Sequence, residues 1–231
     1  MCRALPSALR SRSKSQRFWA LEDVSFALPH GEVLGVIGRN GSGKSTLLFA
    51  IAGILIPDRG RIATAGKTFP LLTLGAGFEA DLTGRENIYL NAAFLGVPRK
   101  LAEERIDAII EFSDLGAFID VPIRKYSSGM RARLGFSIAA HVEPDILLLD
   151  EVMGVGDAAF YDKSKAKLKE LMKRAQAIVI VSHNADFILE TCTTSLWLED
   201  GRVAGEGPPE EVMDDYLAAA NKPRRVIRAT A

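Results

Sequence analysis

The chain has 231 residues, of which 48% are hydrophobic, and its 29 Lys and Arg balance its 29 Asp and Glu. This length suits one large domain or one domain with a subdomain, and a net charge of zero gives no global indication of nucleic acid or of an acidic ligand. Its 2 cysteines are too few for a disulfide framework. No apolar run reaches the roughly 20 residues that cross a bilayer. The composition therefore indicates a folded protein of a reducing compartment that would reach a membrane through a partner.

The charges are unevenly spread along the chain. Residues 1–17 and 221–231 carry only basic charges. We treat them as an N-terminal extension and a C-terminal tail that flank a domain of residues 18–220. Two interpretations stay open for these ends: solubilising tails, or contact with an anionic membrane surface, where each basic residue is worth about 1 kcal/mol. Residues 1–17 also have the Arg- and Ser-rich, acid-free composition of a transit peptide.

Residues 18–31 alternate apolar residues with others before a Pro-His-Gly turn. This pattern predicts a strand that enters a turn. Phe18 and Trp19 lie at its start, where an aromatic ring could stack on a nucleotide base or pack at the strand edge. The apolar residues of the predicted strand are Val24, Phe26 and Leu28.

The next segment has the pattern of a phosphate-binding loop between a strand, 33–37, and a helix that continues over 47–52. Glycines allow successive backbone N–H groups to point into one concavity, and the start of the helix adds its positive end. Lys44 would bring its charge to the β- and γ-phosphates, and Ser45 would offer a hydroxyl to Mg²⁺. The loop residues are Gly38, Arg39, Asn40, Gly41, Ser42, Gly43, Lys44, Ser45 and Thr46.

A mostly helical stretch follows the loop. Short strand-like runs first occupy 61–65 and 68–74. Thr83 and Glu86 then have the spacing of a helix capping box. Apolar residues recur with helical periodicity beyond them. Residues 75–141 are therefore expected to form a helical insertion in an α/β chain.

Two further strands carry polar residues at their ends. Four apolar residues at 146–149 predict a strand buried on both faces, which ends in Asp150 and Glu151. An aspartate placed there can hold Mg²⁺ through water. Glu151 points elsewhere, because strand residues alternate, and is placed to polarise the water that attacks the γ-phosphate. The next buried strand, 177–181, precedes His183, whose imidazole would either contact the γ-phosphate or be structural.

The end of the chain completes an α/β pattern. A charged helix is predicted over 157–174, a hairpin turn at Asp200 and Gly201, and a closing helix over 208–217. Buried strands that alternate with helices around a phosphate-binding loop are typical of the α/β class.

Over residues 18–217 the sequence resembles the ATP-binding subunits of ABC transporters. Residues 38–46 resemble the Walker A motif of that family, and 146–151 resemble its Walker B motif with the catalytic glutamate. Asp157 occupies the place of the D-loop, and His183 occupies that of the switch histidine. The residues that resemble the family signature are Tyr126, Ser127, Ser128, Gly129 and Met130.

The resemblance implies a fold and an assembly. The fold is a P-loop NTPase core of RecA type, with an N-terminal antiparallel β subdomain and a helical subdomain at about 75–141. In this family the signature binds the γ-phosphate of ATP held by the Walker A motif of a second subunit. The resemblance therefore implies a homodimer with two ATP molecules sandwiched between its copies.

The resemblance also implies the roles of particular residues. Glu151 and His183 would be catalytic, and Ser45 and Asp150 would hold Mg²⁺. Adenine would stack on Phe18 or Trp19, since the family's usual stacking tyrosine is not at its expected spacing. The family's Q-loop glutamine, which senses Mg²⁺ and contacts the membrane subunit, is also missing. The residues near its expected place are Thr73, Leu74 and Gly75.

The form of the motifs narrows the resemblance. The signature reads Tyr-Ser-Ser-Gly-Met where commoner ones read Leu-Ser-Gly-Gly-Gln, and it is similar to that of bacterial exporters of O-antigen, capsular polysaccharide or teichoic acid. Such a subunit would lie at the cytoplasmic face of the bacterial inner membrane, bound to a polytopic permease expected in two copies. It would meet polysaccharide only indirectly and nucleic acid not at all. The further motifs that carry this similarity lie at 18–21, 74–78, 82–88 and 155–160.

Three alternatives remain at this stage. The cargo could be a lipid, a drug or a protein. The chain could be a non-transport ABC ATPase that acts on nucleic acid, although such proteins usually show long coiled coils or tandem cassettes. A single-copy P-loop kinase or GTPase would leave the signature at 126–130 unexplained.

Overall fold

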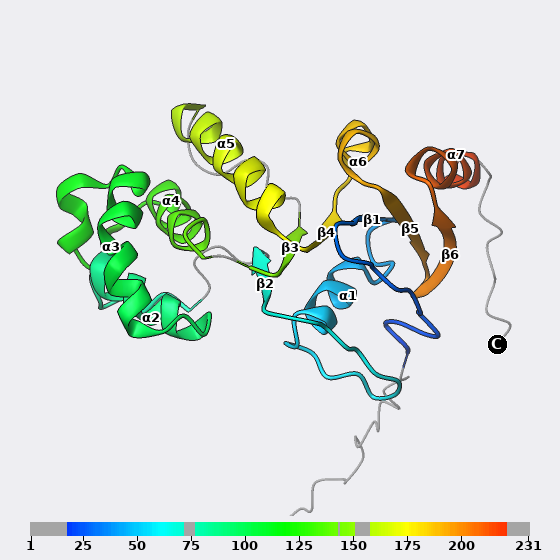
Figure 1. Cartoon of the computed structure of the whole chain (residues 1–231), viewed down its shortest axis with the longest axis horizontal. Helices are drawn as coiled ribbons and strands as arrows, with labels where there is room; N and C mark the ends of the chain where they lie inside the picture. The colour runs from blue at the N-terminus through cyan, green and yellow to red at the C-terminus, as the bar shows by residue number, and fades with distance from the viewer. Residues whose placement is uncertain (1–17, 72–76, 143, 151–157, 221–231) are drawn as a thin grey trace, which may run out of the picture.

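A six-stranded sheet forms the centre of the computed structural model, which describes residues 18–71, 77–142, 144–150 and 158–220 (Figure 1). Its strand order is β2-β3-β4-β1-β5-β6. All neighbouring pairs are parallel except β5 with β6, which is antiparallel. The strands are β1 (Val33–Ile37), β2 (Thr68–Leu71), β3 (Ile146–Asp150), β4 (Ala177–Val181), β5 (Thr194–Glu199) and β6 (Arg202–Gly207).

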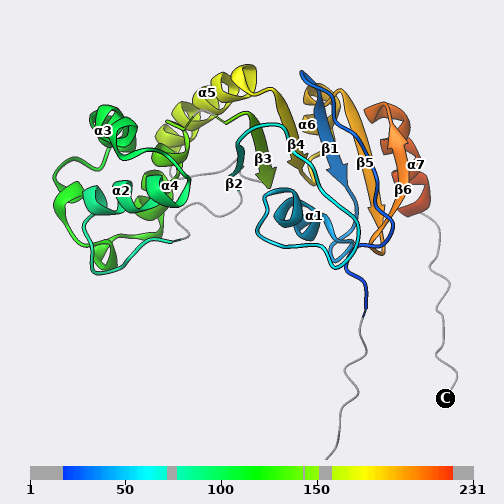
Figure 2. The ribbon, with the colours of Figure 1, turned by 60° about the horizontal axis from the view of Figure 1, so that its bottom comes forward.

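Helices cover both faces of this sheet, and a second group of helices lies at one end of the molecule (Figures 1 and 2). The core helices are α1 (Lys44–Ile51), α5 (Ala158–Arg174), α6 (Ala185–Thr191) and α7 (Pro209–Ala220). The end group consists of α2 (Gly84–Phe94), α3 (Arg99–Ser113) and α4 (Ser128–Ala139), with 3₁₀ turns at Gly116–Asp120 and Ile123–Lys125. The helical stretch predicted from periodicity is thus confirmed over the residues described.

Alternating strand residues divide the core into two layers. Leu147 and Leu149 of β3 pack in a cluster with side chains of α5, α6 and α7, whereas Leu148 packs in the cluster that contains α1. Residues of β4 divide in the same way. The strand predicted at 146–149 is therefore buried on both faces, as its run of apolar residues indicated.

The helical end group has a hydrophobic cluster of its own. Ile88 of α2, Ile106 of α3 and Leu134 of α4 are buried together. The predicted capping box is present at the start of α2. Thr83 Oγ1 accepts a hydrogen bond from the backbone N–H of Glu86, and Glu86 Oε2 accepts one from the backbone N–H of Thr83.

Removal of this cap gives a first prediction. Thr83→Ala should lower the free energy of unfolding by about 1 kcal/mol, because the helix loses a side-chain acceptor for its first N–H groups. Urea denaturation measures the change. Thr83→Ser is the control that keeps the hydroxyl, and equal loss in the two variants would show that the hydroxyl is not what stabilises the helix.

The strands predicted at 18–31 and 61–65 are wrong, and the described residues before β1 contain no strand. The antiparallel β subdomain that the resemblance implied therefore has no strands there. The alternation of apolar residues is nevertheless real, since Leu21, Val24, Phe26 and Leu28 pack against the α1 side of the core. Alternation of apolar residues indicates which side chains face the core. A strand also requires backbone hydrogen bonds to a neighbouring strand. Here the backbone hydrogen bonds go to isolated loop residues such as Gly201.

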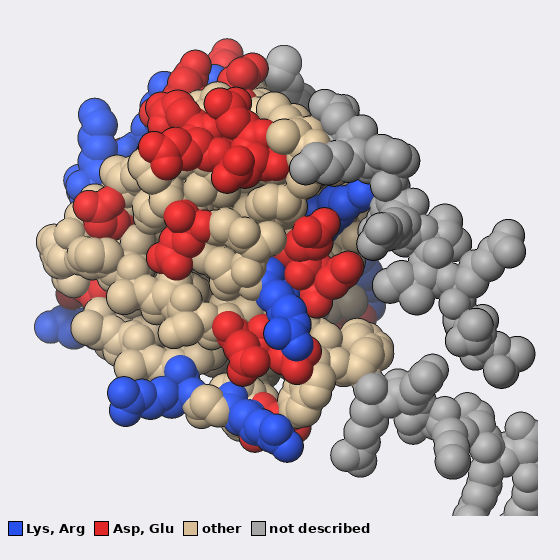
Figure 3. Space-filling view, turned by 90° about the vertical axis from the view of Figure 1, so that its right-hand side faces the viewer, with Lys and Arg blue, Asp and Glu red and all other residues tan. Residues whose placement is uncertain are grey.

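The exposed face of α7 is acidic (Figure 3). An anionic membrane surface would repel this face, so the face is unsuited to lie on one. None of the described helices combines the length and apolar character that crossing a membrane requires. The exposed acidic residues of α7 are Glu210, Glu211, Asp214 and Asp215.

Candidate functional site

The loop of residues 38–46, Asp150 and the segment that leads to His183 lie at the carboxyl ends of three neighbouring strands. In the order β3-β4-β1, Val181 of β4 pairs with Asp150 on one side and with Val36 on the other. The three strands therefore end at the same level. Asp150, the segment that leads to His183 and the loop after β1 share one edge of the sheet (Figure 2). Ligands of open parallel sheets bind at such an edge.

The loop after β1 has the curled backbone that its glycines predicted. Gly38, Gly41 and Gly43 have φ values of +147°, +82° and +104°. At Gly38 a Cβ would lie 2.3 Å from the carbonyl oxygen of Leu198, so no other residue fits there. Gly43 forms the N-cap of α1. The loop therefore directs the N–H groups of the first turn of α1 towards its own concavity.

Lys44 fills the interior of this loop. Only 7% of the residue is exposed, and its Nζ donates hydrogen bonds to the carbonyl oxygens of Gly38 at 2.7 Å and of Arg39 at 2.8 Å. The Oγ of Ser42 lies above Gly38, where it is buried without a hydrogen-bond partner among the described residues. A buried hydroxyl with an unused donor fits a loop that receives an anionic oxygen.

Ser45 and Asp150, the two residues that were predicted to hold Mg²⁺, contact each other across the sheet edge. The Oγ of Ser45 donates a hydrogen bond to Oδ2 of Asp150 at 3.5 Å. Both are hard oxygen ligands of the kind that Mg²⁺ prefers, and Mg²⁺ commonly uses one or two protein oxygens together with phosphate oxygens. The donor chemistry of this pair therefore fits the metal.

The loop is braced by segments that sequence reasoning did not connect with it. The backbone N–H of Gly201 donates to the carbonyl of Ser42, and the backbone N–H of Glu22 donates to the carbonyl of Gly201. The carbonyl oxygen of Ala20 lies 2.7 Å from where a Cβ on Gly43 would be. The β5–β6 turn, which the Asp-Gly pair predicted, thus supports the phosphate loop. The turn and the loop are far apart along the chain, so no local sequence pattern predicts this contact.

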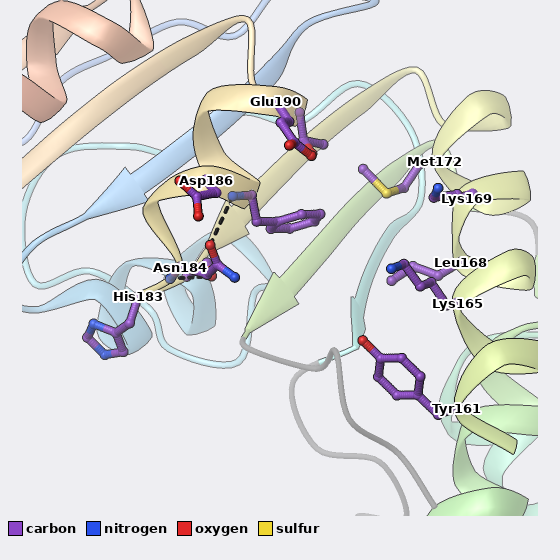
Figure 4. A pocket seen from close by; sticks show the side chains of 12 residues that line it. Tyr161, Lys165, Leu168, Lys169, Met172, His183, Asn184, Asp186 and Glu190 are labelled. Atoms are coloured by element: carbon purple, nitrogen blue, oxygen red, sulfur yellow. Dashed lines mark hydrogen bonds between the residues drawn. The ribbon is translucent and has the colours of Figure 1, made fainter. Parts of the chain in front are cut away.

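His183 is exposed just after β4 and is one of the residues that line a pocket of about 750 Å³ between α5 and α6 (Figure 4). Its ring points away from the α5 side chains that line the opposite wall. The pocket carries Lys165 and Lys169 on α5 and Asp186 and Glu190 on α6. No residue of the phosphate loop lines it, so this pocket is separate from the phosphate loop.

The signature residues divide into an anchor and an exposed end. Tyr126 is only 4% exposed, and its hydroxyl donates to the carbonyl of Phe118 at 2.6 Å. Burial raises the pKa of this hydroxyl. A Cβ on Gly84 would lie 2.3 Å from the same hydroxyl oxygen, so Gly84 makes room for it. The Tyr126 side chain therefore anchors the segment inside the helical group and is withdrawn from any ligand.

The exposed end of the signature is the start of α4. Ser127 is the N-cap, and its Oγ accepts a hydrogen bond from the N–H of Met130. Ser127 and Ser128 are exposed, and a Cβ on Gly129 would have only Ser127 Oγ nearby, at 3.8 Å. This helix start is open to an approaching group. In both ribbon views it lies in the helical end group, apart from α1 and its loop (Figures 1 and 2).

Several predicted site residues lie outside the described residues: Glu151, Asp157 and the segment 73–75. Of the two aromatic candidates for base stacking, Phe18 is 86% exposed. Trp19 is 48% exposed and has the guanidinium of Arg59 over its ring.

Comparison with known proteins identifies the family of this chain. Residues 21–154 match the family model described as ABC transporter. An O-antigen export system ATP-binding protein of Klebsiella pneumoniae is 48% identical over 206 residues, which cover 89% of this chain and 84% of the relative. A teichoic acids export ATP-binding protein of Lactococcus lactis is 45% identical over 211 residues, which cover 91% of this chain and 45% of the relative.

Solved structures show the same fold. The chain superposes on the ATP-binding subunit of an ABC transporter with a TM-score of 0.73 at 23% identity, over 88% of this chain and 93% of that one. A dimeric post-hydrolysis state of an ATP-binding cassette bound to ADP and Pi gives a TM-score of 0.66 at 23% identity, over 83% and 91%. This chain therefore belongs to the ABC transporter family, among its ATP-binding proteins.

Proposed function

We propose that this chain is the ATP-hydrolysing subunit of an exporter of cell-surface polysaccharide, of the O-antigen, capsule or teichoic acid type. The observation that carries the ATPase is the curled loop with buried Lys44, set beside the Ser45–Asp150 pair at one sheet edge. The cargo rests on the relatives, whose names assign them to O-antigen and teichoic acid export. Transport would require a separate polytopic permease, in two copies.

The residues of the loop would share the work on the nucleotide. The backbone N–H groups at the start of α1 and the Ser42 hydroxyl would donate to phosphate oxygens, and Lys44 would exchange its carbonyl partners for the β- and γ-phosphates. Ser45 and Asp150 would hold Mg²⁺, which neutralises phosphate charge when it is bound. Phosphoryl transfer relies chiefly on such positioning and electrostatic stabilisation.

Glu151 would accept the proton of the attacking water, and His183 would donate to the γ-phosphate. Both follow strands whose ends are level with the loop, β3 and β4. Asp157 would act in the D-loop.

The second half of the site would come from another copy of the chain. The open start of α4, with Ser127 and Gly129, lies apart from the loop of its own chain (Figure 1). Its N–H groups and helix dipole suit an anionic oxygen. We assign residues 18–220 to one cassette, with 75–141 as its helical subdomain, placed peripherally on the cytoplasmic face of the inner membrane.

An export assay tests the cargo. In a strain that lacks the gene, the wild-type chain should restore polysaccharide at the cell surface. A Lys44→Ala variant should leave the polymer inside the cell. Deletion of the permease gene should give the same internal accumulation. The strain that lacks the gene of this chain could instead keep its surface polysaccharide and lose another exported lipid or protein. That result would contradict polysaccharide as the cargo and would identify the lost molecule as the cargo.

A further inference from the structure

Arg59, which lies outside the family motifs, forms an exposed pair with Trp19. The Cζ of Arg59 lies 5.3 Å from the centre of the Trp19 ring. Both side chains reach solvent, with Trp19 48% exposed. Tryptophan is the best aromatic partner for a cation, and a guanidinium stacks on it with little loss of hydration. Arg59 therefore restricts the orientation of the indole ring.

This pair stands beside the phosphate loop. Ala20 follows Trp19 directly, and its carbonyl oxygen lies 2.7 Å from where a Cβ on Gly43 would be. Gly43 is the N-cap of α1, where the phosphates are expected. The loop that carries Arg59 runs past the first described residues in Figure 2. A base joined through a ribose to phosphates in the loop is thus within reach of Trp19.

We infer that Arg59 is a positioning residue of the nucleotide site, which holds the Trp19 indole so that a base stacks on the indole. The inference rests on the proposed ATP binding and extends it to a residue outside the family motifs. It also decides between the two aromatic candidates, because Phe18 is 86% exposed, whereas Trp19 is 48% exposed and has Arg59 over its ring. Since every base has a π face, stacking adds affinity without selecting one base.

The contribution of Arg59 to nucleotide affinity should depend on the presence of a base and not on the phosphates. In Arg59→Ala, the dissociation constant of ADP should rise about two- to fivefold, the size of an exposed cation–π contact. The affinity for inorganic tripolyphosphate, which has no base, should stay unchanged. Trp19→Ala should weaken ADP about tenfold or more, because it removes the stacking surface itself. Arg61→Ala is the matched control, an exposed arginine two positions away.

Isothermal titration of the full chain measures these constants, and thermal melting confirms that each variant is folded. The difference in fluorescence between wild type and Trp19→Phe reports Trp19 without touching the buried Trp197, and ADP should quench it. Equal weakening of ADP and tripolyphosphate in Arg59→Ala, or no weakening of ADP, would overturn the inference, as would an unquenched Trp19. Failure of the proposed ATP binding can be distinguished from failure of the Arg59 inference. If the loop does not bind phosphate, Lys44→Ala would bind ADP and tripolyphosphate with the same affinity as wild type.

Discussion

Replacement of Lys44 by alanine is expected to weaken ATP binding about 100-fold or more and to remove measurable hydrolysis. The side chain is buried in the loop and donates two hydrogen bonds to loop carbonyls. A bound phosphate would take over these donors. Hydrogen bonds with a charged partner contribute about 1.5–3 kcal/mol each, and about 1.4 kcal/mol corresponds to tenfold in affinity. Two such bonds account for the predicted loss.

Calorimetric titration with ATP and a phosphate-release assay measure the two effects. Lys67→Ala is the matched control, because Lys67 is exposed and outside the loop, and it should bind ATP as wild type does. Lys44→Arg should not restore binding, since a planar guanidinium does not fit a hole shaped for an ammonium. Binding by Lys44→Ala within threefold of wild type would contradict the placement of phosphate in this loop.

The phosphate loop was predictable because its determinants are local. Glycines at 38, 41 and 43 permit the left-handed backbone values that are observed there. Lys44 starts the helix, as the sequence pattern required. The buried strand at 146–149 was also predictable, because a strand that is buried on both faces has a continuous run of apolar residues. The conformation of a segment was therefore predictable where all the residues that determine it lie in one short stretch of sequence.

Contacts between distant segments were not predictable in this way. The brace of the loop by Gly201 joins residues about 160 positions apart along the chain, and an Asp-Gly pair signals only its own turn. The anchoring of Tyr126 depends on space left by Gly84, which local patterns do not reveal. At 18–31 the apolar alternation predicted which side chains pack, partly buried, against the core, yet it could not show that no strand lies beside them.

Replacement of Glu151 by glutamine is expected to preserve ATP binding, reduce turnover and trap a dimer. Glutamine has nearly the same shape as glutamate but cannot accept the proton of the attacking water, and loss of a general base costs about 10²–10⁴-fold in rate. The phosphate loop with Lys44 and the open start of α4 lie apart within one chain (Figure 2). ATP that is held but not hydrolysed should therefore link the loop of one copy to the α4 start of another.

Light scattering after gel filtration, with and without ATP, measures the mass of the variant, and phosphate release measures its turnover. Adding Gly129→Glu to Glu151→Gln supplies the control. The space above Gly129 is open, and a carboxylate is favourable in the first turn of a helix, so the fold should persist. That carboxylate would repel the γ-phosphate of the other copy. The double variant should bind ATP and stay monomeric.

Turnover tests Glu151 as the general base, and the mass of the variant tests the ATP-linked dimer. Wild-type turnover in Glu151→Gln would remove Glu151 as the general base and leave the dimer open to test. An ATP-bound Glu151→Gln variant that stays monomeric would instead favour a P-loop enzyme that works as a single copy. A dimer that survives Gly129→Glu would mean that the copies join through a surface other than the start of α4. Only loss of the dimer in the double variant places Ser127 and Gly129 at the ATP of the partner.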